Sequence, residues 1–254
     1  MQGERRRSGP RTERGPALPA LRGAHDVVYG RNPVTEALRG RRAVQRIWAA
    51  RADDVVGTAA VPVEKASADE LARRAGSPDH QGLVAEVDPY PYADPTTMLR
   101  DENALVIVLD QVQDPGNLGA ICRTAEVAGA SGVVIPTRRA AAVTPAVCKA
   151  SAGAVEHLPI ARVANLVSWL TQAKQAGGWI YGAQSTAEDS YVDAELSGRV
   201  VLVLGGEATG LRPLVAGACD ALVAIPQSGR TESLNVAAAA AVLVFEAVRR
   251  QPRD

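Results

Sequence analysis

The sequence is short of cysteine, histidine and aromatic residues, and each shortage excludes a class of protein. The cysteines Cys122, Cys148 and Cys219 are far apart and form no C-x-x-C pair, so we expect reduced thiols rather than disulfides or a zinc site. The histidines show no i,i+4 pairing, so we expect no metal ion in this protein. Aromatic residues make up 4% of the chain, which argues against a stacking platform for single-stranded nucleic acid.

Long hydrophobic runs are also missing. The longest uninterrupted apolar run, 236–245, has ten residues, about half of what a membrane-spanning helix needs. The first twenty residues contain arginines and prolines and lack the apolar segment of a signal peptide. A hydrophobic content of 46% and a charged content of 22% are typical of a globular protein. We therefore expect a cytoplasmic protein without a membrane partner.

Charge is balanced over the whole chain but not along it. Residues 1–51 contain twelve arginines and four acidic residues, a net charge of +8, so residues 52–254 carry −8 because the whole chain is neutral. A basic N-terminal part indicates a polyanionic partner. A solvated tail without a binding role is the alternative. If the partner is RNA, the scarcity of aromatic residues predicts that phosphate contacts and shape dominate its recognition.

The N-terminal third of the chain divides into a tail and a small domain. Residues 1–24 are rich in Arg, Gly and Pro without apolar periodicity, which predicts a disordered basic tail. Residues 25–90 are expected to form a small α/β domain, and a linker is placed at 91–103 because 88–95 is rich in proline. The predicted elements are a helix capped by Asn32 and ended by Gly40, a helix opening on Ser67 with Glu70 as its capping-box partner, and strands at 46–50, 61–65 and 82–87.

Residues 104–254 are expected to form a larger α/β domain around a mainly parallel sheet. Apolar strand-like runs alternate with helical segments, the pattern of a sheet covered by helices on both faces. The predicted strands are 104–110, 132–136, 157–161, 179–183, 200–205 and 221–225. The predicted helices are 118–129, 145–153, 164–178, 211–218 and a last helix from Leu234 onward. Ligands of such sheets bind at the carboxyl ends of the strands.

Three of these strands are followed by polar turns that contain glycine. Strand 104–110 continues into "QVQDPGNLGAICRTAEVAG", strand 200–205 into "GEATGLRP" and strand 221–225 into "PQSGRTESLN". Polar side chains beside such apolar sequence must find partners, either as helix caps or as ligand contacts. No Walker loop, G-x-S-x-G elbow or complete G-x-G-x-x-G motif is present, which excludes the common nucleotide and hydrolase motifs. We expect the three turns to converge on one pocket.

Together with their flanking strands, the three turns resemble, in order and spacing, the three motifs of the SpoU branch of the SPOUT RNA 2′-O-ribose methyltransferases. The small domain, from "YGRNPVTEAL" to "HQGLVAEV", resembles the L30e-like substrate-binding domain of the ribosomal RNA members of that branch. The resemblance covers residues 27–249 and implies a methyltransferase domain with a C-terminal trefoil knot, an exception to the rule against threaded chains. One departure is Gln227, where the family usually has Met after Ile-Pro.

The resemblance implies that S-adenosyl-L-methionine binds between three loops of the knot, at 204–210, 224–229 and 233–235. The adenine is expected to lie among apolar walls and backbone groups, and glycine at two positions would let the backbone approach the ligand closely. The residues implied in cofactor binding are Leu204, Gly205, Gly206, Ile225, Ser233 and Leu234. The alternative is a set of ordinary strand-to-helix turns, which would not need so many polar residues.

The same resemblance implies a substrate side made of catalytic residues. These are Arg123, Asn117, Glu207, Ser233 and Asn235. The mechanism of the family centres on Arg123, usually as the group that removes the ribose 2′ proton. Because a guanidinium is almost never deprotonated in proteins, we expect instead that Arg123 clamps a phosphate and stabilises a developing alkoxide. The alternative is a surface arginine paired with Glu126.

For the other catalytic candidates, a purely structural role has to be weighed against a functional one. Glu207 is expected to anchor a neighbouring Arg or Asn and to shape the pocket. Ser233 is also a candidate cap of the last helix, so a structural and a functional role coexist there. Asn235 would lie inside the first turn of that helix, where asparagine is a poor choice, so we expect it to be functional.

The resemblance also implies partners. In this family the knot forms a homodimer interface and both subunits contribute active-site groups. The leading prediction is 2′-O-ribose methylation of a guanosine in 23S rRNA, because the small domain matches the rRNA-directed members. A tRNA 2′-O-methyltransferase and an antibiotic-resistance rRNA 2′-O-methyltransferase are alternatives of the same class. A non-catalytic RNA-binding or ribosome assembly factor is the alternative of another class, and the presence of all five catalytic candidates argues against it.

Overall fold

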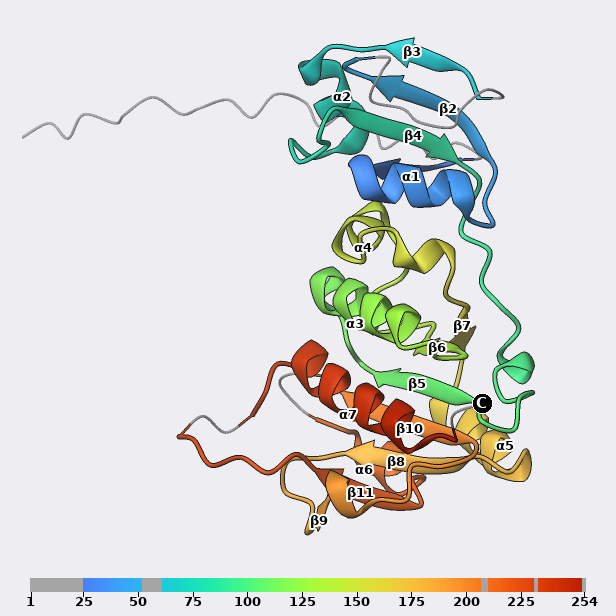
Figure 1. Cartoon of the computed structure of the whole chain (residues 1–254), viewed down its shortest axis with the longest axis vertical. Coiled ribbons are helices and arrows are strands. Elements are labelled where there is room, and N and C mark those ends of the chain that lie inside the picture. The colour runs from blue at the N-terminus through green and yellow to red at the C-terminus, as the bar shows by residue number, and fades with distance from the viewer. Residues whose placement is uncertain (1–24, 52–60, 207–209, 231–232, 253–254) are drawn as a thin grey trace, which may run out of the picture.

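The small and the larger domain are each built on a sheet of their own (Figure 1). A computed structural model describes residues 25–51, 61–206, 210–230 and 233–252, so the predicted tail lies outside the described residues. Among these residues the small sheet has the strand order β1-β4-β2-β3, with β4 antiparallel to both of its neighbours and β3 parallel to β2. Its strands are β1 (Asp26–Tyr29), β2 (Val44–Ala49), β3 (Val63–Lys65) and β4 (Leu83–Val87). The first of them was not predicted.

The helix α2 (Ala68–Ala75) of the small domain begins as predicted. The Ser67 Oγ accepts a hydrogen bond from the Glu70 N–H at 3.3 Å, and Gly76 ends the helix with a φ of 64°, a value that favours glycine. The Glu70 carboxylate accepts bonds from Arg74 one turn further along. Only the serine half of the predicted capping box is therefore present among the described residues.

The helix α1 (Arg31–Arg39) begins earlier than predicted. Its N-cap is Gly30, with a φ of 96°, so the expectation that Asn32 caps this helix is wrong. Asn32 is a better cap by residue type, but the N-cap position lies two residues before it. The predicted end is confirmed, because Gly40 is the C-cap.

The larger sheet is parallel throughout its described strands. Their order is β7-β6-β5-β10-β8-β11-β9. The strands are β5 (Leu105–Asp110), β6 (Gly132–Pro136), β7 (Ile160–Val163), β8 (Trp179–Ala183), β9 (Asp189–Ser190), β10 (Val200–Gly205) and β11 (Ala221–Ala224). The predicted strand 157–161 is shifted, since 154–156 form a 3-10 turn and the chain becomes extended only at Ile160. The short β9 was not predicted.

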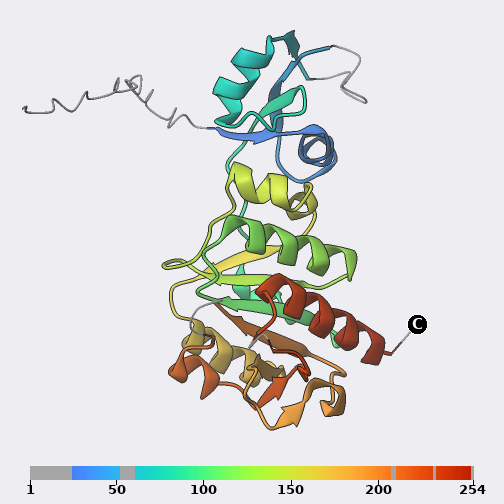
Figure 2. The same cartoon turned by 90° about the vertical axis from the view of Figure 1, so that its left-hand side faces the viewer.

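Helices cover both faces of this sheet (Figure 2). The face towards the small domain carries α3 (Pro115–Val127), α4 (Pro145–Ala150) and α7 (Val236–Arg250). The opposite face carries α5 (Leu166–Gln175) and α6 (Pro213–Ala216). Short 3-10 turns are η2 (Pro95–Thr97), η3 (Ala154–Glu156) and η4 (Tyr191–Asp193). Within the described ranges, none of the helices combines the length and hydrophobicity that crossing a bilayer requires.

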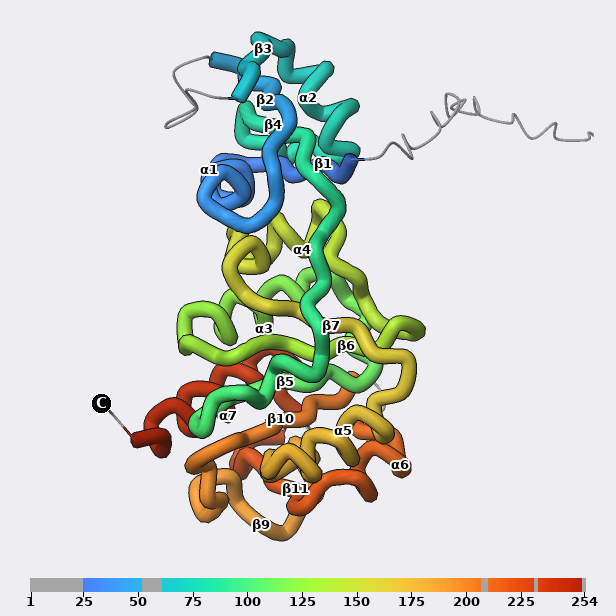
Figure 3. Tube along the Cα trace, turned by 90° about the vertical axis from the view of Figure 1, so that its right-hand side faces the viewer, coloured from blue at the N-terminus to red at the C-terminus, as the bar shows by residue number. Residues whose placement is uncertain are grey.

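The connection between the domains packs against the larger domain (Figure 3). After β4 the chain runs along one side of the molecule, past α4, to reach β5. The Tyr90 hydroxyl lies 2.9 Å from the carbonyl oxygen of Val155 and 3.1 Å from that of Leu158. The Ala93 N–H donates to the carbonyl of Ile160 at 2.8 Å. These bonds hold the small domain in a defined orientation.

A buried ion pair also joins the two domains. The Arg42 Nε donates to the Glu156 carboxylate at 2.9 Å, and a second guanidinium nitrogen contacts the other carboxylate oxygen. The two side chains are 2% and 0% exposed. Burial acts to lower the pKa of Arg42, but the hydrogen bond and charge of Glu156 outweigh it and raise that pKa. At the rim, His157 Nε2 lies 2.8 Å from a Glu36 carboxylate oxygen.

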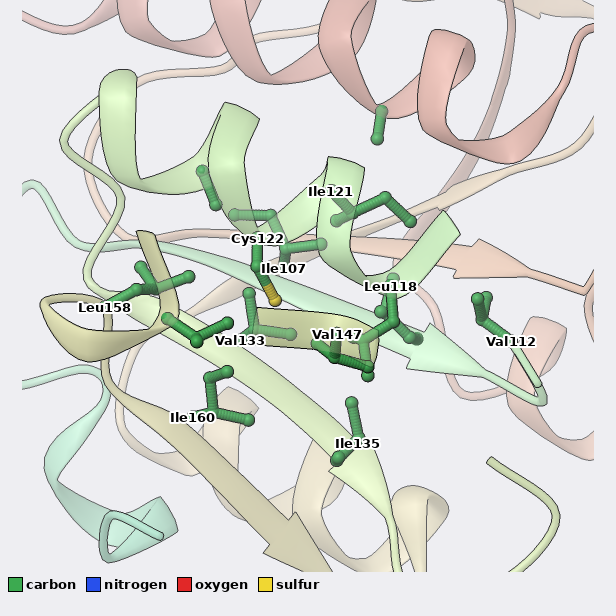
Figure 4. Packing of buried hydrophobic residues seen from close by; sticks show 14 of the residues in the cluster. Ile107, Val112, Leu118, Ile121, Cys122, Val133, Ile135, Val147, Leu158 and Ile160 are labelled. Carbon is green, nitrogen blue, oxygen red and sulfur yellow. The ribbon is translucent and has the colours of Figure 1, made fainter. Parts of the chain in front are cut away.

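The core of the larger domain is built around the strand β5, which is buried along its whole length. Ile107 packs with Leu118 and Ile121 of α3 (Figure 4), while Val106 and Val108 belong to the cluster on the opposite face with α5. Each fully buried aliphatic side chain of this kind contributes roughly 1.5–3 kcal/mol. A rigid sheet therefore supports the loops at its carboxyl edge.

Candidate functional site

A cavity lies at the carboxyl edge of β10, β8 and β11, where the three predicted knot loops meet. The turn after β5, which we expected to join them, is not among the described residues that line it. Its volume is about 390 Å³, which is within the range of small-molecule sites. The six residues predicted to bind the cofactor all line it: Leu204, Gly205, Gly206, Ile225, Ser233 and Leu234. Gln227, the departure from the family pattern, lines it too. The fold thus gathers three separate segments around one space.

Two glycines at the end of β10 leave no room for a side chain. A Cβ at Gly205 would lie 2.0 Å from the carbonyl carbon of Gly210, and one at Gly206 would lie 2.8 Å from the backbone oxygen of Gln111. The Gly210 N–H donates to the Gly206 carbonyl at 2.9 Å, so Gly210 lies directly against the end of β10. Close approach within the chain is therefore a sufficient reason for both glycines, beside the ligand approach inferred from the sequence.

The beginnings of α3 and α7 are joined by two asparagines. The Asn235 Nδ2 donates to the Asn117 Oδ1 at 3.0 Å. The Asn235 Oδ1 accepts from the N–H groups of Ala237 at 2.8 Å and Ala238 at 3.3 Å, so Asn235 is the N-cap of α7. The expectation that Ser233 caps this helix is wrong, because α7 begins two residues later than predicted. For the same reason Asn235 has a stronger structural role than we expected. One side chain both starts the helix and reaches towards α3.

Two aspartates of the first motif have fixed partners. The Asp114 carboxylate caps α3 by accepting the Asn117 N–H at 2.7 Å. Asp110, at the end of β5, is fully buried, and it accepts the Arg212 backbone N–H at 2.9 Å and the Arg212 Nε at 2.7 Å. This pair ties the loop after β10 to the neighbouring strand. This pair was not predicted from the sequence, although an acidic residue at the end of a strand buried on both faces must find a partner.

Arg123 lies apart from the asparagine pair. It follows Asn117 by six residues on α3, about a third of a turn around the helix. Its side chain is exposed and makes no hydrogen bond or ion pair with any described residue, Glu126 included. The described residues that line the cavity do not include Arg123, Asn117 or Asn235. Glu207 lies outside the described residues.

Acidic, histidine and cysteine side chains do not gather anywhere in the described part of the chain as a group that could hold a metal ion. The thiols of Cys122 and Cys148 are buried, and burial raises the pKa of Cys148 to about 11. Such thiols are unreactive at neutral pH.

Family models match both domains. Residues 104–245 match the model described as the SpoU rRNA Methylase family, and residues 27–93 match the one described as RNA 2′-O ribose methyltransferase substrate binding. The first match alone spans more than half of the chain. The chain belongs to the SpoU family.

Individual relatives of this SpoU chain agree with that result. A Bacillus subtilis protein named as a TrmH family tRNA/rRNA methyltransferase, YacO, is 36% identical over 247 residues, which cover 89% of this chain and 96% of the relative. The crystal structure of the SpoU methyltransferase AviRb from Streptomyces viridochromogenes with the cofactor AdoMet has a TM-score of 0.77 at 26% identity, covering 89% and 90% of the two chains. The AdoMet-bound rRNA methyltransferase from Sinorhizobium meliloti has a TM-score of 0.76 at 28% identity, covering 89% and 87%. The predicted fold class, a SPOUT methyltransferase domain after a small α/β domain, is confirmed.

Proposed function

We propose that this SpoU protein transfers the methyl group of S-adenosyl-L-methionine to the 2′ oxygen of a guanosine in 23S rRNA. Family membership makes the chain an RNA methyltransferase. The observation that carries the cofactor assignment is that the six residues predicted to bind the cofactor all line one cavity. It lies at the strand ends, where sheets of this kind bind ligands.

The cavity suits S-adenosyl-L-methionine in size and chemistry. Its walls combine the apolar side chains of Ile225, Leu234 and Val236 with the backbone of Gly205 and Gly206. Apolar walls suit an adenine ring, and peptide groups without side chains in front of them can hydrogen-bond its edge. When bound, the cofactor supplies an electrophilic methyl group. AdoMet in two solved relatives supports the assignment.

Arg123 is proposed to hold the phosphate beside the target ribose. Its exposed guanidinium has no bond to a described residue, so its donors remain for the substrate. A guanidinium can bind a phosphate through two parallel N–H bonds, which would orient the neighbouring 2′ oxygen. Its positive charge would stabilise the alkoxide as the proton leaves. The asparagine pair, Ser233 and Glu207 are proposed to complete the substrate side.

We further propose that the active unit is a homodimer. In one chain Arg123 is not among the described residues that line the cavity, so the partner's cavity is the one it would serve. Exposed apolar side chains lie on the same helices: Val127 of α3 is 67% exposed and Phe245 of α7 is 49% exposed. The two helices pack against each other, and exposed apolar side chains on them support a subunit interface in this part of the molecule.

The proposed substrate is 23S rRNA, with tRNA as the second candidate. The Sinorhizobium meliloti structure is of an rRNA methyltransferase, whereas the Bacillus subtilis name covers both tRNA and rRNA. Both RNAs are cytoplasmic in bacteria, and we propose that location for this protein. A non-catalytic role in ribosome assembly is disfavoured because the chain keeps all five catalytic candidates.

Labelled methyl transfer tests the proposal. Full-length protein is incubated with methyl-tritiated S-adenosyl-L-methionine and either 23S rRNA or tRNA purified from cells that lack the protein. We expect label on 23S rRNA, at a ribose that primer extension maps to a guanosine. Label on tRNA alone would favour the second candidate. Cofactor binding in a calorimeter without transfer to either RNA would favour the assembly factor, and no cofactor binding would overturn the assignment of the cavity.

A further inference from the structure

A second cavity lies at the same edge of the sheet, beside the first. Its volume is about 630 Å³, and it is lined by Gln111 after β5, by the loop after β6, by 164–167 at the start of α5 and by the start of α6. Leu211 lines the first cavity and the next residue, Arg212, lines the second. The loop after β10 therefore forms a wall of both cavities.

Arginines are concentrated in this second cavity. Its described lining contains Arg138, Arg139 and Arg212 and no acidic residue, although residues 104–254 as a whole have twelve basic and thirteen acidic residues. Arg212 is bound to the buried Asp110 but keeps 43% of its side chain exposed. Arg138 and Arg139 are exposed and make no hydrogen bond or ion pair with any described residue. Two positive charges at the cavity are therefore left without a partner within the described chain, a state that suits an anionic ligand.

The rest of the cavity wall is apolar. It includes Leu166, Val167 and Val215, which belong to the starts of α5 and α6, and Leu214, which is 79% exposed. A small inorganic anion would use the arginines alone, and an apolar ligand would not need them. A nucleotide uses both surfaces, because its phosphate binds guanidinium groups and its base packs against apolar side chains.

The backbone at this cavity is unusual as well. Gln111 and Arg139 have φ values of 63° and 56°, in the left-handed region that non-glycine residues seldom adopt. Both residues line the cavity. Such conformations persist where the surrounding structure enforces them, and they cluster at ligand sites.

We propose that the second cavity binds one unpaired nucleotide of the RNA substrate, outside the methylated ribose itself. Its phosphate lies against Arg138 and Arg139, and its base packs on the apolar wall that includes Val167 and Leu214. The inference rests on the proposed function, because the nucleotide enters the cavity as part of the RNA. Arg212 connects the two sites, since it lines this cavity while the residue before it lines the cofactor cavity.

Removal of the two unpaired charges tests the proposal. The full-length variant Arg138→Gln/Arg139→Gln is compared with the wild type for binding of 23S rRNA transcribed in vitro, over a series of salt concentrations. We expect at least a tenfold loss of affinity and a decrease of about 0.7–0.9 in the salt slope, since the site holds one phosphate and each phosphate contact contributes about that much. Cofactor affinity and melting temperature stay unchanged, because both side chains are exposed.

Two further variants separate a site from a general effect of charge. Arg100→Gln/Arg249→Gln removes the same charge from exposed positions that line neither cavity, and we expect less than half the change in slope. Leu214→Asp places a negative charge on the apolar wall and should also weaken RNA binding without unfolding the protein.

The outcomes distinguish this inference from the proposed function. If the wild type methylates RNA but the cavity variants bind it with wild-type affinity and slope, the second cavity is not a nucleotide site. An equal loss in the control variant would overturn it too. If the wild type itself methylates neither 23S rRNA nor tRNA, the proposed function fails before this question arises.

Discussion

The domain interface and the carboxyl edge of the large sheet hold polar side chains in opposite ways. At the interface Arg42 and Glu156 are 2% and 0% exposed and bind each other. At the edge, Arg138 and Arg139 are exposed and bind no described residue, and the same holds for Arg123 further along α3. A buried polar group has to be satisfied within the fold, whereas an exposed one keeps its donors for a ligand. The first region thus fixes the domains, and the second is free to recognise a substrate.

The largest effect is expected from breaking the interface pair. Glu156→Gln leaves the Arg42 guanidinium buried without its main counter-charge, which costs about 3–5 kcal/mol in similar cases. Asp26, 3.8 Å from Arg42, compensates part of the charge, so we expect about 3 kcal/mol, measured by urea unfolding. Replacing both partners in Arg42→Met/Glu156→Leu should cost less than the single change. Equal losses in the two variants would contradict a charge effect.

A matched control lies at the rim of the same interface. Glu36 pairs with His157 at 2.8 Å, but the two side chains are 27% and 35% exposed. Because solvent screens such a pair, Glu36→Gln should cost below about 1 kcal/mol. The contrast between the two glutamates measures what burial adds to a hydrogen-bonded carboxylate at this interface.

Arg123 represents the exposed side chains of the comparison, and Arg123→Ala should change catalysis and leave stability unchanged. We expect methyl transfer to fall by roughly 10²–10³-fold or more, because a preorganised charge at the reacting oxygen is lost. The melting temperature and cofactor affinity should match the wild type, since the side chain is exposed and lies outside the cavity lining. Arg100→Ala, also at an exposed position, is the control. Transfer at the wild-type rate would remove Arg123 from the mechanism.

Asn235 has both a structural role and a proposed catalytic role, and two substitutions separate them. Asn235→Asp keeps the oxygen that caps α7 but loses the amide donor to Asn117, so stability should change little while methyl transfer falls. Asn235→Ala loses the cap as well and should cost about 0.5–2 kcal/mol. Urea unfolding and initial transfer rates are measured for both variants. If Asn235→Asp is as active as the wild type, the asparagine pair is a structural feature only.

The difference between the two regions also explains what the sequence could predict. The bounds of β6, β8 and β10 agree with those predicted, because each is a continuous apolar run with clear boundaries. The start of α7 could not be located in the same way, since Ser233 and Asn235 are both good caps and only the surrounding fold selects between them.

Long-range pairs were beyond the sequence altogether. Arg42 and Glu156 are 114 residues apart, and Asp110 and Arg212 are 102 residues apart, and neither pair has a local pattern that names its partner. The lining of the first cavity was easier, because the predicted residues there stand in contiguous motifs that a family resemblance can match. Motif recognition therefore does not find the long-range pairs that stabilise the fold.

The smallest effect is expected at a surface counterpart of the buried pair, in which the two arginines are 60% and 38% exposed. On α7 the Glu246 carboxylate accepts bonds from Arg249 and Arg250, and these hydrogen bonds lower its pKa from 4.5 to about 2. Because its folded pKa is depressed, the stabilisation is present above about pH 4.5 and is lost as the pH falls towards 2. Screening by solvent limits Glu246→Gln to below about 1 kcal/mol at pH 7. Urea unfolding from pH 7 to pH 3 should show the variant and the wild type converging below pH 4.5. A difference that persists or grows at pH 3 would mean that Glu246 acts through packing rather than charge.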